Sequence, residues 1–94
     1  MKHYIIAKFK EDVDTAALIA PITEVFDKTL NVPGIHGVKV KSCVIARPNR
    51  YDVMIEIDMD KEALDAYDAC EAHKQWKQEY GPLLQAKTIF DSED

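Results

Sequence analysis

Apolar and polar residues alternate along several short segments of the chain, which is the spacing of half-buried β-strands. The clearest segment is residues 51–59, YDVMIEIDM, where every second side chain is apolar. Residues 38–45 alternate in the same way, and residues 3–9 form a β-rich run that is apolar on both sides. A last strand is predicted for residues 85–91, before an acidic tail.

Two segments with helical spacing separate these strands. From about Asp14 onward, apolar residues recur three and four positions apart until Pro33 and Gly34 end the pattern. The second helix is predicted to begin with Asp60 as its N-cap, because short polar side chains satisfy free backbone N–H groups there. We expect it to end near Ala72.

The order of these elements is β-α-β-β-α-β. Two β-α-β halves with right-handed crossovers give an α+β, ferredoxin-like fold, with a four-stranded antiparallel sheet and the helices on one face. This order makes the first and third strands central neighbours. We take residues 1–94 as a single domain, because chains of this length rarely divide into two cores.

The first strand is apolar on both faces, although the helices are expected to cover only one face of the sheet. This pattern indicates that a partner covers the other face. Ile5, Ala7 and Phe9 point one way, while Tyr4 and Ile6 point the other. Met54, with Ile45 and Ile89, is expected to extend the uncovered face. Exposed apolar patches usually contact a partner, so we expect a homodimer with the two helix-free sheet faces together.

Composition narrows the classes of function. The net charge of −5 and the lack of a basic stripe argue against nucleic-acid binding. No apolar run approaches the roughly 20 residues that cross a membrane. We expect a cytoplasmic protein, since no signal-peptide pattern is seen, with Cys43 and Cys70 as reduced core residues. Scattered histidines and cysteines predict neither a metal site nor a cofactor.

Tyr67 and His73 are the best candidates for chemistry. They are six residues apart, and six residues of α-helix turn by about 600°, which is about 120° less than two full turns. In a straight helix their side chains would therefore point in different directions. We therefore expect the helix to end between them and His73 to fold back over a pocket that Tyr67 lines.

A histidine beside a phenol can carry out proton transfer without a metal or cofactor. Histidine, with a pKa of about 6.5, can take a proton from a carbon next to a carbonyl group. The phenol stays protonated and can donate a hydrogen bond to the resulting oxyanion. His3 lies in phase with Ile5 and is expected to face the same apolar cavity, whereas the strand phase leaves the direction of Lys87 open. The expected cavity walls are Ile5, Ala7, Ile22, Val25, Val53, Ile55 and Leu84.

Four short motifs together resemble the stress-responsive dimeric α+β barrel (Dabb) family. They are KHYIIAKFK at the start, NVPGI after the first helix, EALDAY with AH six residues beyond its tyrosine, and the closing IFD. The resemblance covers nearly the whole chain, in the expected order. It implies a small homodimer of ferredoxin-like subunits, often with no assigned activity.

The chain is also similar to the olivetolic acid cyclase-like members of that family. In those proteins a tyrosine and a histidine catalyse the aldol closure of a linear polyketide, supported by a histidine on the first strand. Motif for motif, the resemblance implies that the three catalytic residues are Tyr67, His73 and His3. Family sequences often carry His-Pro shortly before the last histidine, where this chain has Cys70-Glu71.

Three functions stay open at this point. The first is a homodimer with a hydrophobic pocket for an apolar or poly-carbonyl small molecule, in a stress-related or uncharacterised role without turnover. The second is a cofactor-free polyketide cyclase or isomerase that uses the pair of His73 and Tyr67. The third is a monooxygenase of the wider dimeric α+β barrel group, either cofactor-independent or haem-degrading.

Overall fold

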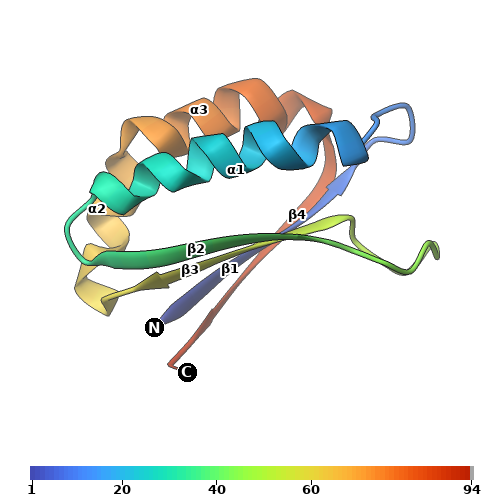
Figure 1. Ribbon diagram of the computed structural model, residues 1–94. Helices are drawn as coiled ribbons and strands as arrows, with labels where there is room; N and C mark the ends of the chain where they lie inside the picture. Colours follow the sequence, from blue (N-terminus) through green and yellow to red (C-terminus); the bar gives the residue numbers. More distant parts are fainter. Residues whose placement is uncertain (94) are drawn as a thin grey trace.

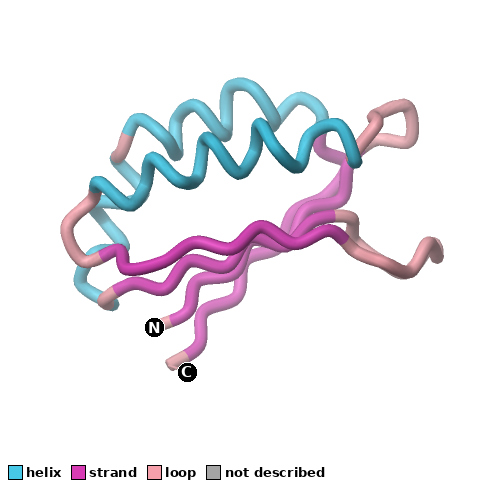
Figure 2. Tube along the Cα trace, in the orientation of Figure 1, coloured by secondary structure: helices cyan, strands magenta, loops and turns pink. Residues whose placement is uncertain are grey.

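Four antiparallel strands form one sheet, with all helices packed on one of its faces (Figures 1 and 2). The computed structural model describes residues 1–93. The strands are β1 (Lys2–Phe9), β2 (Ile35–Ser42), β3 (Val53–Met59) and β4 (Leu84–Ser92), in the order β2-β3-β1-β4. The central position of β1 and β3 confirms the ferredoxin-like topology expected from the order of elements.

The helical layer consists of three helices and short 3-10 turns that extend them. The helices are α1 (Ile19–Asp27), α2 (Leu64–Ala69) and α3 (Glu71–Tyr80). The 3-10 turns are Ala16–Leu18, Lys28–Asn31, Lys61–Ala63 and Gly81–Leu83. α1 and α3 run side by side across the sheet, and α2 lies at one end (Figure 1).

β2 is displaced toward the N-terminus relative to the prediction of residues 38–45. It begins at Ile35, directly after Gly34, whose φ of 92° lies in the left-handed region that favours glycine. It ends at Ser42, and the residues from 43 to 52 form a loop that projects beyond the sheet (Figure 2). Cys43 and Ile45 are therefore exposed loop residues, so the predictions of a core cysteine and of Ile45 on the sheet face were wrong.

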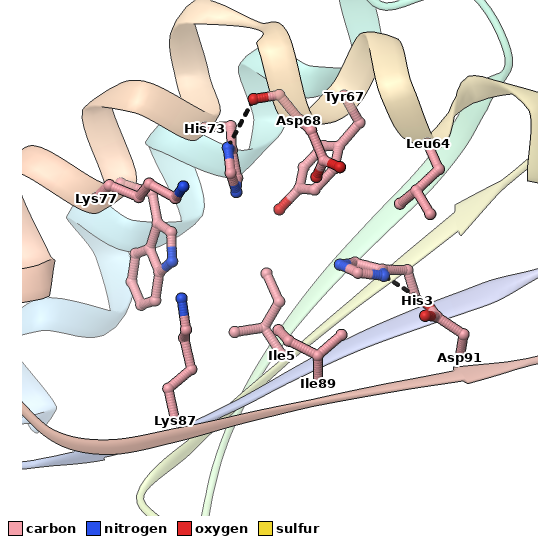
Figure 3. A pocket seen from close by; sticks show the side chains of 11 residues that line it. His3, Ile5, Leu64, Tyr67, Asp68, His73, Lys77, Lys87, Ile89 and Asp91 are labelled. Carbon is pink, nitrogen blue, oxygen red and sulfur yellow. Dashed lines mark hydrogen bonds and ion pairs between the residues drawn. The ribbon is translucent and has the colours of Figure 1, made fainter.

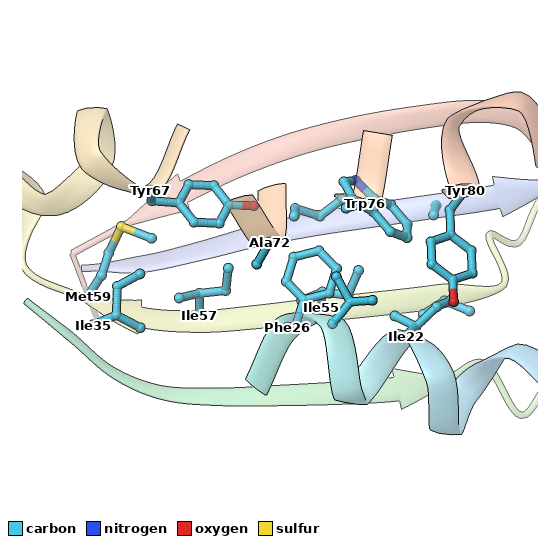
Figure 4. Close-up of a cluster of buried hydrophobic side chains, with 14 of the residues drawn as sticks. Ile22, Phe26, Ile35, Ile55, Ile57, Met59, Tyr67, Ala72, Trp76 and Tyr80 are labelled. Carbon is cyan, nitrogen blue, oxygen red and sulfur yellow. The ribbon is translucent and has the colours of Figure 1, made fainter. Parts of the chain in front are cut away.

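The hydrophobic core fills the space between the sheet and the helices (Figure 4). Phe26 of α1 meets Trp76 of α3 edge to face at 5.2 Å between ring centroids, and Trp76 stacks on Tyr80 at 5.5 Å. Aromatic pairs of this kind add to the apolar area they bury. Five expected cavity walls are core residues with at most 3% of their surface exposed: Ala7, Ile22, Val25, Val53 and Ile55.

The helix-free face of the sheet carries a patch of apolar side chains, which we call the open-face patch: Tyr4, Ile6, Met54 and Phe90. Ile6 is paired with Met54, and Tyr4 lies 6.3 Å from the ring of Phe90, which is 61% exposed. Ile89 is not part of the patch, because it pairs with buried Ile5 and cross-strand partners share a face. Its predicted place on this face was wrong.

None of the helices formed by residues 1–93 is both long enough and apolar enough to span a membrane.

Candidate functional site

The helical segment that carries Tyr67 and His73 is interrupted between them. α2 ends at Ala69, Cys70 adopts an extended backbone with φ −74° and ψ 158°, and α3 begins at the next residue. The Cys70 sulfur accepts a hydrogen bond from the backbone N–H of His73 at 3.4 Å, which is the role of an N-cap. The expected turn is therefore present, but at Cys70 rather than near Ala72, and it leaves the two rings 4.9 Å apart.

An open cavity of about 450 Å³ lies between α2, α3 and the helix-facing side of β1 and β4 (Figure 3). It is located where β1 begins and β4 ends. Its lining is a mixture of apolar and charged side chains: His3, Ile5, Leu64, Tyr67, Asp68, His73, Trp76, Lys77, Lys87, Ile89 and Asp91.

His3 is held in one orientation by Asp91 on the neighbouring strand. The two residues are cross-strand partners of β1 and β4, and the Nδ1 atom of His3 lies 2.5 Å from a carboxylate oxygen of Asp91. Because a carboxylate only accepts, Nδ1 is the donor, and Nε2 of the neutral ring is left without a proton. His3 is only 5% exposed, and Figure 3 shows this second nitrogen directed into the cavity.

His73 is held in the same tautomer by the backbone. Its Nδ1 atom donates to the carbonyl oxygen of Asp68 at 2.9 Å, so Nε2 is the nitrogen that faces the cavity (Figure 3). Burial lowers the pKa of His73 below its ordinary value of 6.5, and the charges of Lys77 and Lys87 lower it further, although the backbone carbonyl and the carboxylate of Asp68 oppose them. His73 is therefore a neutral base at neutral pH.

Tyr67 presents a buried hydroxyl between the two histidines. Its side chain is 1% exposed, and its ring centroid lies 5.3 Å from that of His3 and 4.9 Å from that of His73. Burial raises the pKa of Tyr67 above its ordinary value of 10.0, so the hydroxyl stays protonated. The hydroxyl has no hydrogen-bond partner among residues 1–93, and it points into the cavity (Figure 3).

The three predicted catalytic side chains thus converge, but the predicted walls do not. Of the seven expected wall residues only Ile5 lines the cavity; Leu84, like the five core residues named above, lies elsewhere, packed against the core. The expectation of purely apolar walls was wrong because the cavity lies at the end of the sheet, beyond the main core.

The cavity residues that the sequence did not predict come from the helices and from β4; those of the helices are Leu64, Asp68, Trp76 and Lys77. Lys87, Ile89 and Asp91 alternate along that strand, and their partners Ala7, Ile5 and His3 face the helices. The phase of β4 could not be read from its sequence, because the adjacent Ile89 and Phe90 are both apolar. The pairing of β4 with β1 determines which β4 side chains face the helices, and Lys87 is one of them.

The full chain, residues 1–94, matches the model of the Stress responsive A/B Barrel Domain (Dabb) family. It belongs to the Dabb family. No match was found among curated proteins.

Solved structures place this Dabb protein among ferredoxin-like proteins. A dimeric protein of unknown function from Bacteroides fragilis has 12% identity and a TM-score of 0.80, over 99% of this chain and 94% of that chain. A protein from Arabidopsis thaliana has 20% identity and a TM-score of 0.78, over 99% and 93% of the two chains. The hydroxynitrile lyase from Passiflora edulis has 12% identity and a TM-score of 0.74, over 99% and 94%. At these identities the likeness concerns the fold alone, and it confirms the ferredoxin-like class.

Proposed function

We propose that this Dabb protein binds a small carbonyl compound in the cavity and transfers a proton at the carbon next to the carbonyl group. The observation that carries the proposal is the buried Tyr67 hydroxyl, which has no partner among the described residues and lies between two histidine rings. A buried donor without an acceptor costs folding free energy, so a ligand that supplies an acceptor would recover that cost.

The proposed reaction assigns one task to each side chain. The Tyr67 hydroxyl donates a hydrogen bond to the carbonyl oxygen of the ligand, and this bond strengthens as negative charge develops there. The Nε2 atom of neutral His73 takes the proton from the adjacent carbon, which leaves an enolate. Return of the proton from His73 to another carbon gives isomerisation. Attack of the enolate on a second carbonyl carbon of the same molecule closes a ring, and His73 then returns its proton to the new alkoxide oxygen.

His3 and Asp91 supply a second group that can accept a proton. The Nδ1 atom of His3 contacts the Asp91 carboxylate, which fixes the ring so that its Nε2 atom faces the ligand. We assign the first proton transfer to His73, whose pKa is lowered and whose ring is neutral. His3 then supports the pair, as in the role expected from the sequence.

Exchange of carbon-bound protons tests this proposal without knowledge of the natural substrate. The probe is 2,6-heptanedione in D₂O, and NMR follows the protein-dependent loss of the protons next to its carbonyl groups. We expect His73→Ala and Tyr67→Phe each to lower the protein-dependent rate by about 10²-fold. The control is His36→Ala, because His36 is an exposed histidine that contacts Asp60 outside the cavity.

The outcomes separate binding from proton transfer. The assigned roles would be contradicted if His36→Ala lowered the exchange rate as much as His73→Ala and Tyr67→Phe do. They would also be contradicted if neither His73→Ala nor Tyr67→Phe lowered it. Binding of the diketone that depends on Tyr67, without any exchange, would refute proton transfer and favour the function without turnover.

We also propose that the protein forms a homodimer through the open-face patch. Support comes from its relatives of ferredoxin-like fold, several of which are described as dimeric, and from Phe90, an exposed ring on the edge strand β4 of an otherwise uncovered face. In sedimentation experiments at micromolar concentration we expect a dimer for the unmodified chain and a monomer for Phe90→Lys. Leu30→Lys is the control, because Leu30 is also exposed but lies in the helical layer. A monomeric unmodified chain would contradict the proposal.

A further inference from the structure

We infer that the ligand of this cavity is an oxo acid, whose carboxylate is bound by Lys77 and Lys87 while its carbonyl group meets Tyr67. The inference rests on the proposed function and narrows its substrate class from carbonyl compounds in general to anionic ones. It is carried by the position of the two lysines, which the proposed proton transfer does not use.

The two lysines come from different elements and converge on one side of the cavity. Lys77 extends from α3 and Lys87 rises from β4, and both ammonium groups lie on the same side of the cavity (Figure 3). Among residues 1–93, neither ammonium group has a hydrogen-bond or ion-pair partner, whereas Lys74, one turn earlier on α3, pairs with Glu71 at 3.5 Å. Both lysines also lower the pKa of His73, so their charges are felt inside the cavity.

Two unpaired cations on the same side of the cavity repel, and an anion between them would convert this repulsion into attraction. The arrangement is notable in a chain with a net charge of −5, which repels anions in general. A local pair of cations can still attract an anion to the cavity, because field lines are concentrated where low-dielectric walls enclose the charges.

The carboxylates of the cavity are separated from the lysines. Asp91 contacts His3 at the far side of the cavity, and Asp68 lies beside Tyr67 on α2 (Figure 3). The cavity therefore has a cationic end and an end where the Tyr67 hydroxyl and the Nε2 atoms of both histidines converge, beside the Asp68 and Asp91 carboxylates. A ligand with a carboxylate at one end and a carbonyl oxygen at the other complements both ends, whereas an uncharged diketone complements only one.

Three probes of similar length test the inference: 5-oxohexanoate, its methyl ester, and hexanoate. Affinities are measured by NMR titration of the full chain at low ionic strength. We expect the oxo acid to bind about tenfold tighter than the ester, because charge-assisted hydrogen bonds to the lysines are lost in the ester. Hexanoate is expected to bind more weakly than the oxo acid, since it offers no acceptor to Tyr67.

The variants assign this preference to particular charges. The double variant Lys77→Met and Lys87→Met keeps most of the aliphatic stems and is expected to bind acid and ester equally. Lys87→Arg retains the charge and is expected to retain the preference for the acid. Lys74→Met removes the same charge from the same helix outside the cavity, and should leave the preference intact. Thermal unfolding of each variant confirms that it is folded.

Each result decides one of the two proposals. Equal binding of acid and ester by the unmodified chain, with dependence on Tyr67, overturns the oxo-acid inference and leaves the proposed function standing. Equal loss of the preference in Lys74→Met also overturns it, because the effect would then be one of net charge. Lysine-dependent binding of both 5-oxohexanoate and hexanoate, with no dependence on Tyr67, contradicts the proposed function and also overturns the oxo-acid assignment, because the carbonyl group would then make no contact with Tyr67. Failure of all three probes to bind contradicts both.

Discussion

Replacement of Tyr67 by phenylalanine should make this protein more stable and less able to bind its ligand. Tyr67→Phe removes one oxygen atom and keeps the ring, which is 1% exposed and packs between His3 and His73. In most buried tyrosines this change removes a hydrogen bond and destabilises the fold. Here the hydroxyl has no partner among residues 1–93, so the change removes only a desolvated polar group.

The expected gain follows from the cost of burying such a group. An unsatisfied buried donor costs about 1–3 kcal/mol, and we take the lower end of that range as the minimum expected gain. A gain of about 1 kcal/mol in the free energy of unfolding raises the melting temperature of a domain of this size by about 4–8 °C. The measurement is thermal unfolding followed by circular dichroism at one fixed protein concentration, since dimer formation also affects stability.

Tyr80→Phe provides the matched control. Tyr80 is also a buried aromatic residue, on α3, but its hydroxyl is not among the buried groups that lack a partner in the described part of the chain. Its replacement should not raise the melting temperature. A fall in the melting temperature of Tyr67→Phe, relative to Tyr80→Phe, would show that the Tyr67 hydroxyl is satisfied in the folded protein and would remove the main support for the proposed function.

Two further predictions concern pH and the turn before β2. Folding lowers the pKa of His73, so the unfolded chain binds a proton more readily than the folded chain. The contribution of His73 to the free energy of unfolding should therefore be complete above pH 6.5 and fall as the pH drops toward the lowered pKa of the folded state. Urea titrations at several pH values should show this dependence, and the dependence should be weaker in His73→Gln. Gly34→Ala should destabilise the protein by about 1–3 kcal/mol in the same assay, because φ is 92° and the new Cβ would lie 2.9 Å from the Cβ of Ala63; an unchanged midpoint would contradict the strained turn.

The alternating pattern of the strands was sufficient to predict the fold. The strict alternation of residues 51–59 and the order of elements led to β3 and β1 as central strands, and the register confirms this. The β4 residues that line the cavity were harder to predict. Which side chains of β4 face the helices depends on how β4 pairs with β1, rather than on the sequence of β4 itself. For that reason the direction of Lys87 stayed open, Ile89 was assigned to the wrong face and Asp91 was missed.

The relation of Tyr67 to His73 was predictable in outline but not in detail. Helical geometry requires an interruption between two residues six apart if their rings are to meet. The position of the interruption depends on Cys70, which serves as an N-cap through its sulfur atom, and a cysteine gives little sign of that role in a sequence. Its expected place in the core was only partly right, since it is half-buried.

The contact between His3 and Asp91 joins residues that are 88 positions apart in the chain. The cavity is therefore complete only when β4 stays paired with β1 as far as Asp91. A chain shortened after Thr88 would lack Asp91 together with Ile89 and the exposed Phe90, and would lose part of the cavity and of the open-face patch at once. Ligand binding would then report whether the last strand is intact.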